Sequence, residues 1–409
     1  MKILHVIPSF APAWRYGGPI SAAYGMTRAL VRSGHEVTVF TTNLDGAGVL
    51  DVPIAKPVEV DGVETWYFPV QWPRWYYYSR ELNRQLINHA ADFDVVHIHS
   101  IFLWPTTAAA RACRNAGVPY VSRPAGMLQA DHLSTSYLSN ARSLTSRLKK
   151  LLYLKTVGKS DINGAAALHF TSKSELDSSN PGKYAPRKFV ASLGVDLPLA
   201  DHTASDSLFK KESIHSEKQV ILFLSRLDPV KGLDVLAHAM QLLLSRDDWQ
   251  LVVAGEGTGD YRQVLEKDFA QRGLAQRVEF TGMVVGENKW RTLSNADIFV
   301  LPSYQDSFGV SAVEAMAVGL PVVVSDRVGI SDAITSSSAG LVVPLKADAL
   351  AASIETLLED KQLQSQMGQN GRILTKREFS WDAVIDQTIG MYQELASDYI
   401  EETVSKVTP

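Results

Sequence analysis

Short apolar segments alternate with helix-length segments along most of the chain. Residues 3–7 form a largely apolar run, and after a Gly- and Pro-rich loop the apolar residues between Ile20 and Val31 recur at helical spacing until Gly34. Further strands are predicted at 37–41, 95–99 and 119–122, with an Ala-rich helix at 106–116. This alternation predicts right-handed βαβ units around a parallel sheet.

The same pattern begins again near Gln219. The predicted strands of this second half are residues 220–225, 251–254, 278–280, 298–301, 322–325 and 341–343. Between the first two, the apolar residues from Leu233 to Leu244 fall on one helix face. The second half is therefore predicted to be another doubly wound α/β domain.

A polar, Ser-rich segment at 201–218 has no apolar period and is predicted to be the linker. We therefore predict a Rossmann-like domain at 1–200, a second at 219–379, and a terminal helix at 380–409 with one apolar face. The chain shows no short-period repeat, which excludes solenoids and propellers.

Composition is that of a folded globular protein. Among 409 residues, 45% are hydrophobic and 21% are charged. Cys113 is the single cysteine, so an intrachain disulfide and a CxxC zinc site are excluded, and a reducing, cytoplasmic setting is expected. The first residues do not match a signal peptide, and no apolar run is long enough to span a bilayer.

Charge is distributed unevenly between the halves. Residues 1–195 hold 21 Lys and Arg against 13 Asp and Glu, a net charge of +8, whereas the remainder holds 19 against 31, a net charge of −12. Within the basic half, cations from Arg142 to Lys159 alternate with leucines and indicate an amphipathic helix that could rest on an anionic membrane surface or simply face solvent. Aromatic stacking platforms between basic residues are not evident, which argues against nucleic acid as a partner.

Candidate chemistry follows the predicted strands of the second half. In open parallel sheets, ligands bind beyond the carboxyl ends of the strands, where helix N-termini offer N–H groups to anions. Arg226 and Lys231 follow the strand at 220–225 and indicate a phosphate site, although both could also be solvated charges near a turn.

The segment after the strand at 298–301 reads PSYQDSFGVSAVEAMA and contains Asp306 and Glu314 with seven residues between them. This segment resembles the signature of the retaining glycosyltransferases of family 4, which have the GT-B fold. Gly255-Glu256-Gly257, the segment Phe280 to Met283 and the segment Gly319 to Val323 match further features of that family.

The resemblance implies two Rossmann-like domains with a cleft between them and a C-terminal helix that crosses back to the first domain. It implies transfer of a hexose from a UDP-sugar, or less favourably a GDP-sugar, to a glycan or lipid-linked acceptor, with no metal and no cofactor. Arg226, Lys231 and Asp306 would be catalytic, and Glu314 would hold the ribose. The other donor-binding residues would be Ser307, Phe308, Gly309, Val310, Ser311, Met283 and the pair Gly17 and Gly18.

Two departures from the family pattern bear on activity. Asp306 stands where most relatives have Glu, and Ala125 stands where many have His. Arg123 and His99 are the remaining candidates for acceptor contact or charge stabilisation, and a structural role for each is equally compatible with the sequence. The alternatives are therefore a nucleotide-sugar-binding relative with impaired catalysis or a GT-B-type sugar-nucleotide epimerase.

Other motifs favour rival functions less strongly. The glycines at 255, 257 and 259 lack the spacing of a dinucleotide fingerprint, and Asp92 and Asp94 precede a strand instead of following it. His97 and His99 share a strand face and could bind zinc, but no third ligand is near in sequence. The aromatic residues between Trp72 and Tyr78 could stack on an acceptor sugar or pack under a loop.

Overall fold

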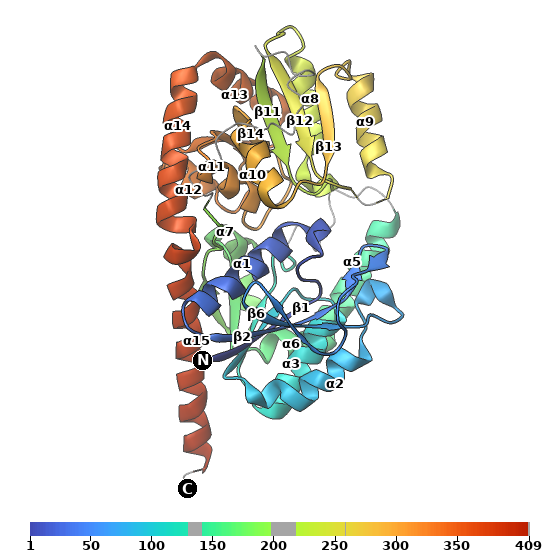
Figure 1. Cartoon of the computed structure of the whole chain (residues 1–409), viewed down its shortest axis with the longest axis vertical. Helices are drawn as coiled ribbons and strands as arrows, with labels where there is room; N and C mark the ends of the chain where they lie inside the picture. Colours follow the sequence, from blue (N-terminus) through green and yellow to red (C-terminus); the bar gives the residue numbers. More distant parts are fainter. Residues whose placement is uncertain (130–140, 198–217, 258, 408–409) are drawn as a thin grey trace. The chain divides into compact units, whose positions relative to one another are not determined.

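The computed structural model describes residues 1–129, 141–197, 218–257 and 259–407, and its contacts divide the chain into two compact units. Unit 1 comprises Met1–Gly194 and the C-terminal helix α15 (Trp381–Val407), and unit 2 comprises Val195–Ser380. The linker predicted at 201–218 lies outside the described residues except for Lys218. Figure 1 shows the elements of both units in sequence colours.

Unit 1 is built on a sheet whose order, in its described part, is β10-β9-β8-β7-β1-β2-β6-β5. The strands are β1 (Lys2–Ile7), β2 (Glu36–Thr42), β5 (Pro57–Val60), β6 (Val63–Phe68), β7 (Val95–His99), β8 (Tyr120–Arg123), β9 (Ala167–Phe170) and β10 (Arg187–Val190). Neighbouring strands pair in parallel, and only β5 runs antiparallel to its partner among these described strands. A small hairpin, β3 (Leu44–Asp45) and β4 (Gly48–Val49), lies outside this sheet.

Helices cover the sheet of unit 1. They are α1 (Gly18–Arg32), α2 (Arg80–His89), α3 (Trp104–Ala116), α5 (Ala141–Lys155), α6 (Val157–Asn163), α7 (Lys173–Ser178) and α15. Ser79 caps α2 and Ser172 caps α7, because each hydroxyl accepts a backbone N–H from the first turn. Leucines, alanines and aromatic residues from α2, α3 and the strands form one buried core.

Four of the strands in unit 1 were predicted by their apolar runs, and they lie within a residue or two of the expected limits. The sequence reasoning missed β5, β6, β9 and β10. Strand β6 alternates buried and exposed positions and follows a turn at Gly62, a signal of period two that could have revealed it. Strand β10 has no fully buried residue, so its sequence has no apolar run.

Unit 2 contains a parallel sheet with the order β13-β12-β11-β14-β15-β16 in the described residues. Its strands are β11 (Gln219–Leu224), β12 (Trp249–Ala254), β13 (Val278–Gly282), β14 (Ile298–Leu301), β15 (Val322–Ser325) and β16 (Gly340–Val343). Strand order reverses between β11 and β14, and such a switch point leaves a crevice at the carboxyl ends of the two strands. All six strands match the predicted segments.

The helices of unit 2 follow its strands in the expected alternation. They are α8 (Leu233–Leu242), α9 (Tyr261–Gln271), α10 (Gly286–Ser294), α11 (Val310–Ala317), α12 (Ser331–Ser336), α13 (Ala347–Glu359) and α14 (Lys361–Leu374). A π-helical turn at Thr375–Phe379 ends the unit. In the described part of the chain, no helix is both long and apolar enough to cross a membrane.

Helix α15 is attached to unit 1 by a buried tryptophan at its first position. Trp381 is 4% exposed, and its indole lies directly above Gly25 of α1 and Gly194. A Cβ atom on either glycine would lie 2.4 Å from the ring. The two glycines therefore leave the space that the indole fills, and α15 packs along α1 and β7.

This packing predicts opposite effects for two Gly→Ala substitutions in helices. Gly25→Ala should lower the free energy of unfolding of unit 1 by about 1–3 kcal/mol, because the added methyl group overlaps the indole. Gly390→Ala in α15 is the matched control, since nothing lies within 4 Å of the new methyl group. The control should raise stability by about 0.5–1 kcal/mol through helix propensity. Urea unfolding measures both, and equal effects of the two substitutions would contradict this packing.

Candidate functional site

The predicted site of unit 2 lies in the loops that leave β11 and β14 at the switch point of the sheet. The first loop contains Arg226 and Lys231, and it approaches the second loop closely at Gly232. A Cβ atom at Gly232 would lie 1.8 Å from the carbonyl oxygen of Pro302, and the residue has a φ of 71°. Tyr304 also donates its backbone N–H to Val230 at 2.8 Å. These contacts bring the two loops together.

Lys231 and Asp306 meet across these loops. The Nζ atom of Lys231 lies 2.6 Å from Oδ2 of Asp306, and the two side chains are only 16% and 15% exposed. The Oδ1 atom of Asp306 accepts the backbone N–H of Phe308 at 3.3 Å. Partial burial strengthens such a charge-assisted contact relative to a surface pair. The structure thus brings together two of the residues predicted from the sequence.

Arg226 lies at the exposed rim of the same loops. Its guanidinium is 3.3 Å from Oδ2 of Asp228, and the arginine side chain is 39% exposed. The other carboxylate oxygen of Asp228 accepts the N–H of Val230 and so begins the short helical turn that ends at Lys231. Arg226 and Lys231 therefore present one exposed and one half-buried cation beside the switch point.

The second loop ends at the N-terminus of α11. Gly309 precedes the helix with a φ of 97°, and a Cβ atom there would lie 2.6 Å from Val328. Phe308 is 2% exposed and packs edge-on against Phe379. Its side chain is thus a buried anchor, while the backbone of this loop stays at the site. The predicted donor-binding residues Ser307, Val310 and Ser311 are half-buried around this turn.

Glu314 has a partner that sequence reasoning missed. Nζ of Lys289 on α10 lies 2.6 Å from Oε1 of Glu314, and the two side chains are 20% and 8% exposed. Lys289 is 25 residues away in sequence, and no motif spacing indicated it. The ammonium group balances the charge of a nearly buried carboxylate and fixes its orientation.

Two exposed apolar side chains lie in the loop after β13 of unit 2. Met283 is 43% exposed and Val285 is 40% exposed, directly after Gly282 with its φ of 78°. Helix α10, which holds Lys289, begins at the next residue, Gly286. Met283 therefore lies on the loop between β13 and α10, the helix that contains Lys289.

In unit 1, Gly17 and Gly18 lie at the N-terminus of α1, one loop beyond β1. Gly17 has a φ of 69°, and nothing lies within 4 Å of the position that its Cβ atom would take. The N–H groups of the first turn of a 15-residue helix therefore lie beside an open backbone position.

Arg123 and His99 are buried next to each other at the carboxyl ends of β8 and β7. They are 4% and 3% exposed, and Nη1 of Arg123 donates to Nδ1 of His99 at 3.3 Å. His99 then donates from Nε2 to Nδ1 of His5 at 2.9 Å, because its other nitrogen is already an acceptor. Burial lowers the pKa of Arg123 to about 10, against the opposing effect of the Glu175 carboxylate. Such burial favours a structural role for both side chains.

A second chain of hydrogen bonds runs through the neighbouring histidines. Nε2 of His169 donates to the carbonyl of Ala191 at 2.8 Å, so Nδ1 of His169 accepts from His97 at 3.3 Å. His97 in turn accepts from the hydroxyl of Tyr392 on α15 at 2.6 Å. The two chains assign one neutral tautomer to each of these four histidines and leave Nε2 of His5 without a partner among the described atoms.

This cluster supplies the third histidine that zinc binding by His97 and His99 would need. The ring nitrogens of His5, His97 and His99 lie within 4.8 Å of one another. However, the Nδ1 lone pair of each already accepts a hydrogen bond, and the Arg123 guanidinium adjoins His99. The residues as arranged do not suit a cation, because a metal needs free lone pairs and no adjacent positive charge.

A buried carboxylate, that of Glu175, binds the backbone of the loop that contains Ala125. Oε1 of Glu175 accepts the N–H of Gly126 at 2.5 Å, and Oε2 accepts the N–H and hydroxyl of Thr171. Ala125 has a φ of 51°, an uncommon backbone conformation for alanine. The pKa of Glu175 is raised above its ordinary value because the effect of burial exceeds the opposing effects of these hydrogen bonds and of Arg123. Glu175 thus positions the loop that contains Ala125.

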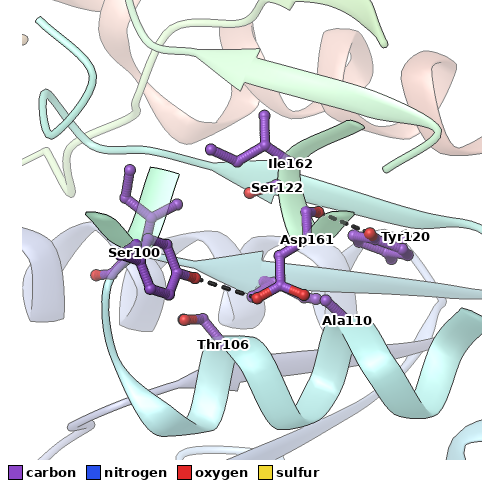
Figure 2. Close-up of a pocket in the computed structure, with 10 residues that line it drawn as sticks. Ser100, Thr106, Ala110, Tyr120, Ser122, Asp161 and Ile162 are labelled. Atoms are coloured by element: carbon purple, nitrogen blue, oxygen red, sulfur yellow. Dashed lines mark hydrogen bonds between the residues drawn. The ribbon is translucent and has the colours of Figure 1, made fainter. Parts of the chain in front are cut away.

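Figure 2 shows an internal cavity of unit 1 around Asp161. Its volume is about 10 Å³, enough for about one water molecule and far too small for a sugar. The hydroxyl of Tyr153 donates to the Asp161 carboxylate at 3.1 Å, and that of Tyr120 donates to its carbonyl at 2.7 Å. The cavity is therefore part of the core and not a ligand site.

Asp94 has a structural role. Its Oδ2 atom accepts the backbone N–H of Lys2 at 2.7 Å, which ties the segment before β7 to the start of β1. Asp94 therefore lies at the amino ends of the strands, as expected for a motif that precedes a strand.

Two family models match most of the chain. The model described as "Glycosyl transferase 4-like domain" matches residues 17–187, and the model described as "Glycosyl transferases group 1" matches residues 204–374. The first match lies within unit 1, and the second covers the switch-point loops and most of unit 2.

Relatives and solved structures agree with these matches. An uncharacterised glycosyltransferase of Methanocaldococcus jannaschii is 27% identical over 96% of this chain and 98% of its own length. A D-inositol 3-phosphate glycosyltransferase of Jonesia denitrificans is 25% identical over 96% and 95%. Sucrose-phosphate synthase from Thermosynechococcus elongatus has the same fold, with a TM-score of 0.74, 22% identity and coverage of 97% and 99%. The Anabaena protein HepE in complex with UDP-glucose has a TM-score of 0.71, 19% identity and full coverage of both chains.

The histidine cluster predicts how unit 1 responds to acid. Burial lowers the pKa of His5 to about 3 and that of His169 to about 4, and the Arg123 charge acts in the same direction. Between these values and the ordinary 6.5, the unfolded chain binds protons that the folded unit does not. Stability should be fully present above pH 6.5 and should fall by about 1.4 kcal/mol per pH unit for each histidine as the pH drops.

The variant His5→Asn isolates one of these groups. The amide oxygen of Asn can accept the His99 hydrogen bond, but the side chain does not titrate. Urea unfolding at several acidic pH values should show a slope about 1.4 kcal/mol per pH unit shallower than in the parent protein. An unchanged slope would mean that His5 is not held neutral in the folded unit.

Proposed function

We propose that this chain, which belongs to the GT-B glycosyltransferases of family 4, transfers a hexose from a UDP-sugar to a glycan or lipid-linked acceptor with retention of configuration. The observation that carries the proposal is the pairing of cations with carboxylates at the switch point of unit 2, where Lys231 lies 2.6 Å from Asp306. A UDP-sugar is preferred to a GDP-sugar, and UDP-glucose is the ligand named for the HepE structure. The reaction would serve polysaccharide or glycoconjugate biosynthesis.

Arg226 and Lys231 would stabilise the departing diphosphate. In the transfer, the bond between the anomeric carbon and the diphosphate oxygen breaks, and negative charge accumulates on that oxygen. These two cations, both in the loop after β11, would supply the electrostatic stabilisation that this step most needs. Because these side chains already supply positive charge at the leaving group, we propose a metal-independent reaction.

The second loop and α11 would hold the sugar and the nucleoside. Asp306 and the backbone from Ser307 to Gly309 would bind the hexose hydroxyls, and the N–H groups of Val310 and Ser311 begin the helix. Glu314, oriented by Lys289, would accept both hydroxyls of the ribose. The exposed side chain of Met283 would pack against the nucleobase.

Unit 1 would supply the acceptor side. The open backbone at Gly17 and the first residue of α1, Gly18, would lie beside the acceptor and the donor phosphate. The loop after β8 has Ala125 in place of histidine and so offers no side-chain base at that position. The acceptor hydroxyl would therefore attack the anomeric carbon from the face that the diphosphate leaves and pass its proton to the departing phosphate oxygen.

A nucleotide-sugar-binding protein with impaired catalysis is the second candidate. Two residues favour it: Ala125 cannot take a proton, and Asp306 is one methylene shorter than the glutamate of most relatives. Binding of a nucleotide sugar without transfer or donor hydrolysis would distinguish this function from catalysis. For either function we propose a cytoplasmic location with peripheral contact at the inner face of the membrane.

The direct test is a thermal-shift and donor-hydrolysis screen with UDP-, GDP- and ADP-sugars. One UDP-sugar should raise the melting temperature, and Glu314→Ala should abolish that rise. Arg226→Ala should lower the rate of hydrolysis on the order of a hundredfold, because one stabilising cation is lost in the transition state. Its folding should change little, since Arg226 is exposed and makes one rim contact.

Lys267→Ala is the matched control, because this exposed lysine of α9 lies outside the switch-point loops. It should leave both binding and rate unchanged. Stabilisation by no nucleotide sugar would overturn the proposed donor site, and a parental rate in Arg226→Ala would remove Arg226 from the mechanism.

A further inference from the structure

Two tryptophans of unit 1 are exposed to an unusual degree. Trp72 is 86% exposed and Trp75 is 69% exposed, although tryptophan is normally among the more buried residues. Trp75 lies in the short helical turn Arg74–Tyr76, and Trp72 lies two residues before it. The neighbouring Tyr76 and Tyr78 contact the ring of Trp104. The tyrosines thus fill the space beneath this loop, and the two indoles project beyond it.

Helix α5 belongs to the same unit (Figure 1), and two of its leucines are strongly exposed. Leu148 is 68% exposed and Leu152, one turn later, is 61% exposed. The opposite face attaches the helix, because Leu154 packs against the core and Tyr153 stacks edge-on against Phe102. Residues Tyr153 and Leu154 therefore attach α5 to the unit, and Leu148 and Leu152 on the other face do not contribute to the core.

The loop and the helix form one continuous surface. The Nζ atom of Lys149 lies 5.5 Å from the centre of the Trp75 ring, which brings α5 next to the tryptophan loop. We call this the apolar–basic surface, and its residues are Trp72, Trp75, Leu148, Lys149, Leu152 and Lys155.

The charge of this surface has one sign. Residues 141–160 and 69–80 contain no Asp or Glu. The acid that follows the first segment, Asp161, is buried, and the acid that follows the second, Glu81, is paired with Arg84 at 2.6 Å. Exposed Lys149 and Lys155 lie on the same face of α5 as the leucines. The side chains of Arg142 and Arg147, which were predicted to extend the basic stretch, lie outside the described residues.

We propose that the apolar–basic surface docks unit 1 on a membrane that contains anionic lipid. Indole rings favour the boundary between headgroups and acyl chains, leucines insert below it, and lysines extend toward anionic headgroups. The absence of acids from both segments is the charge complementarity that such a membrane requires. This proposal rests on the proposed function in one respect, because a lipid-linked acceptor would be present at a membrane surface.

Charge also argues against a second copy of the chain as the occupant. In a two-fold dimer the same surface meets itself, so Lys149 and Lys155 would face their own copies without acids between them. A lipid headgroup, by contrast, supplies the missing negative charge.

Sedimentation with phosphatidylcholine vesicles, with and without phosphatidylglycerol, tests the proposal on the full chain. The parent protein should sediment with the anionic vesicles and not with the neutral ones. Trp72→Ala combined with Trp75→Ala should weaken binding on the order of tenfold, because two inserted rings are lost. Lys149→Gln combined with Lys155→Gln should weaken it roughly fivefold for each lysine. All four residues are exposed, so folding should be preserved.

Matched controls come from exposed residues of unit 2. Leu242→Ser combined with Ile373→Ser removes apolar groups that are 51% and 61% exposed, and Lys267→Gln combined with Lys376→Gln removes two exposed charges. Both controls should bind vesicles like the parent protein. Thermal shift with the UDP-sugar should be unchanged in every variant, so failure of docking is distinguishable from failure of the proposed donor site.

Three results would overturn the proposal. They are retention of vesicle binding in the tryptophan and lysine variants, equal binding to neutral and anionic vesicles, and a dimer in solution that the tryptophan variant abolishes.

Discussion

The ion pair between Lys231 and Asp306 is the charge pair around which the candidate site of unit 2 is built. It joins the loop after β11 to the loop after β14, the two strands between which the sheet order reverses. A parallel sheet leaves its strand ends as loops with few backbone partners, and here a half-buried charge pair and the close approach of Gly232 to Pro302 hold them together. The same pair sets the position of Asp306 before α11.

The two units treat their charged groups differently. Unit 2 keeps Lys231, Asp306, Lys289 and Glu314 in largely buried pairs, where a bound anion can compete for the cations. Unit 1 buries Arg123 and Glu175 and surrounds them with neutral histidines and backbone N–H groups. The first arrangement suits a reaction that moves charge, and the second suits a loop that must remain in one position.

The sequence was sufficient for the doubly wound pattern and for the loops that contain Arg226, Lys231, Asp306 and Glu314, because apolar runs and strand ends are local signals. It did not indicate Lys289, His5 or Glu175. Each of these contacts joins residues from separate strands or helices, so their meeting depends on the fold and leaves no spacing in the sequence. Strand β10 was missed for a different reason, since it is a short edge strand without a fully buried residue. Strand β9 lies inside the sheet and is fully buried, but it has only four residues.

The most direct test of the Lys231–Asp306 pair as the diphosphate site is calorimetric titration of UDP into the parent protein and into Asp306→Asn. The substitution frees Lys231 from its carboxylate and removes a negative charge from the site. The predicted result is UDP binding that is roughly fivefold tighter together with slower sugar transfer, because the hexose contact is lost while the phosphate contact gains. Weaker UDP binding by Asp306→Asn, or unchanged binding, would contradict the account.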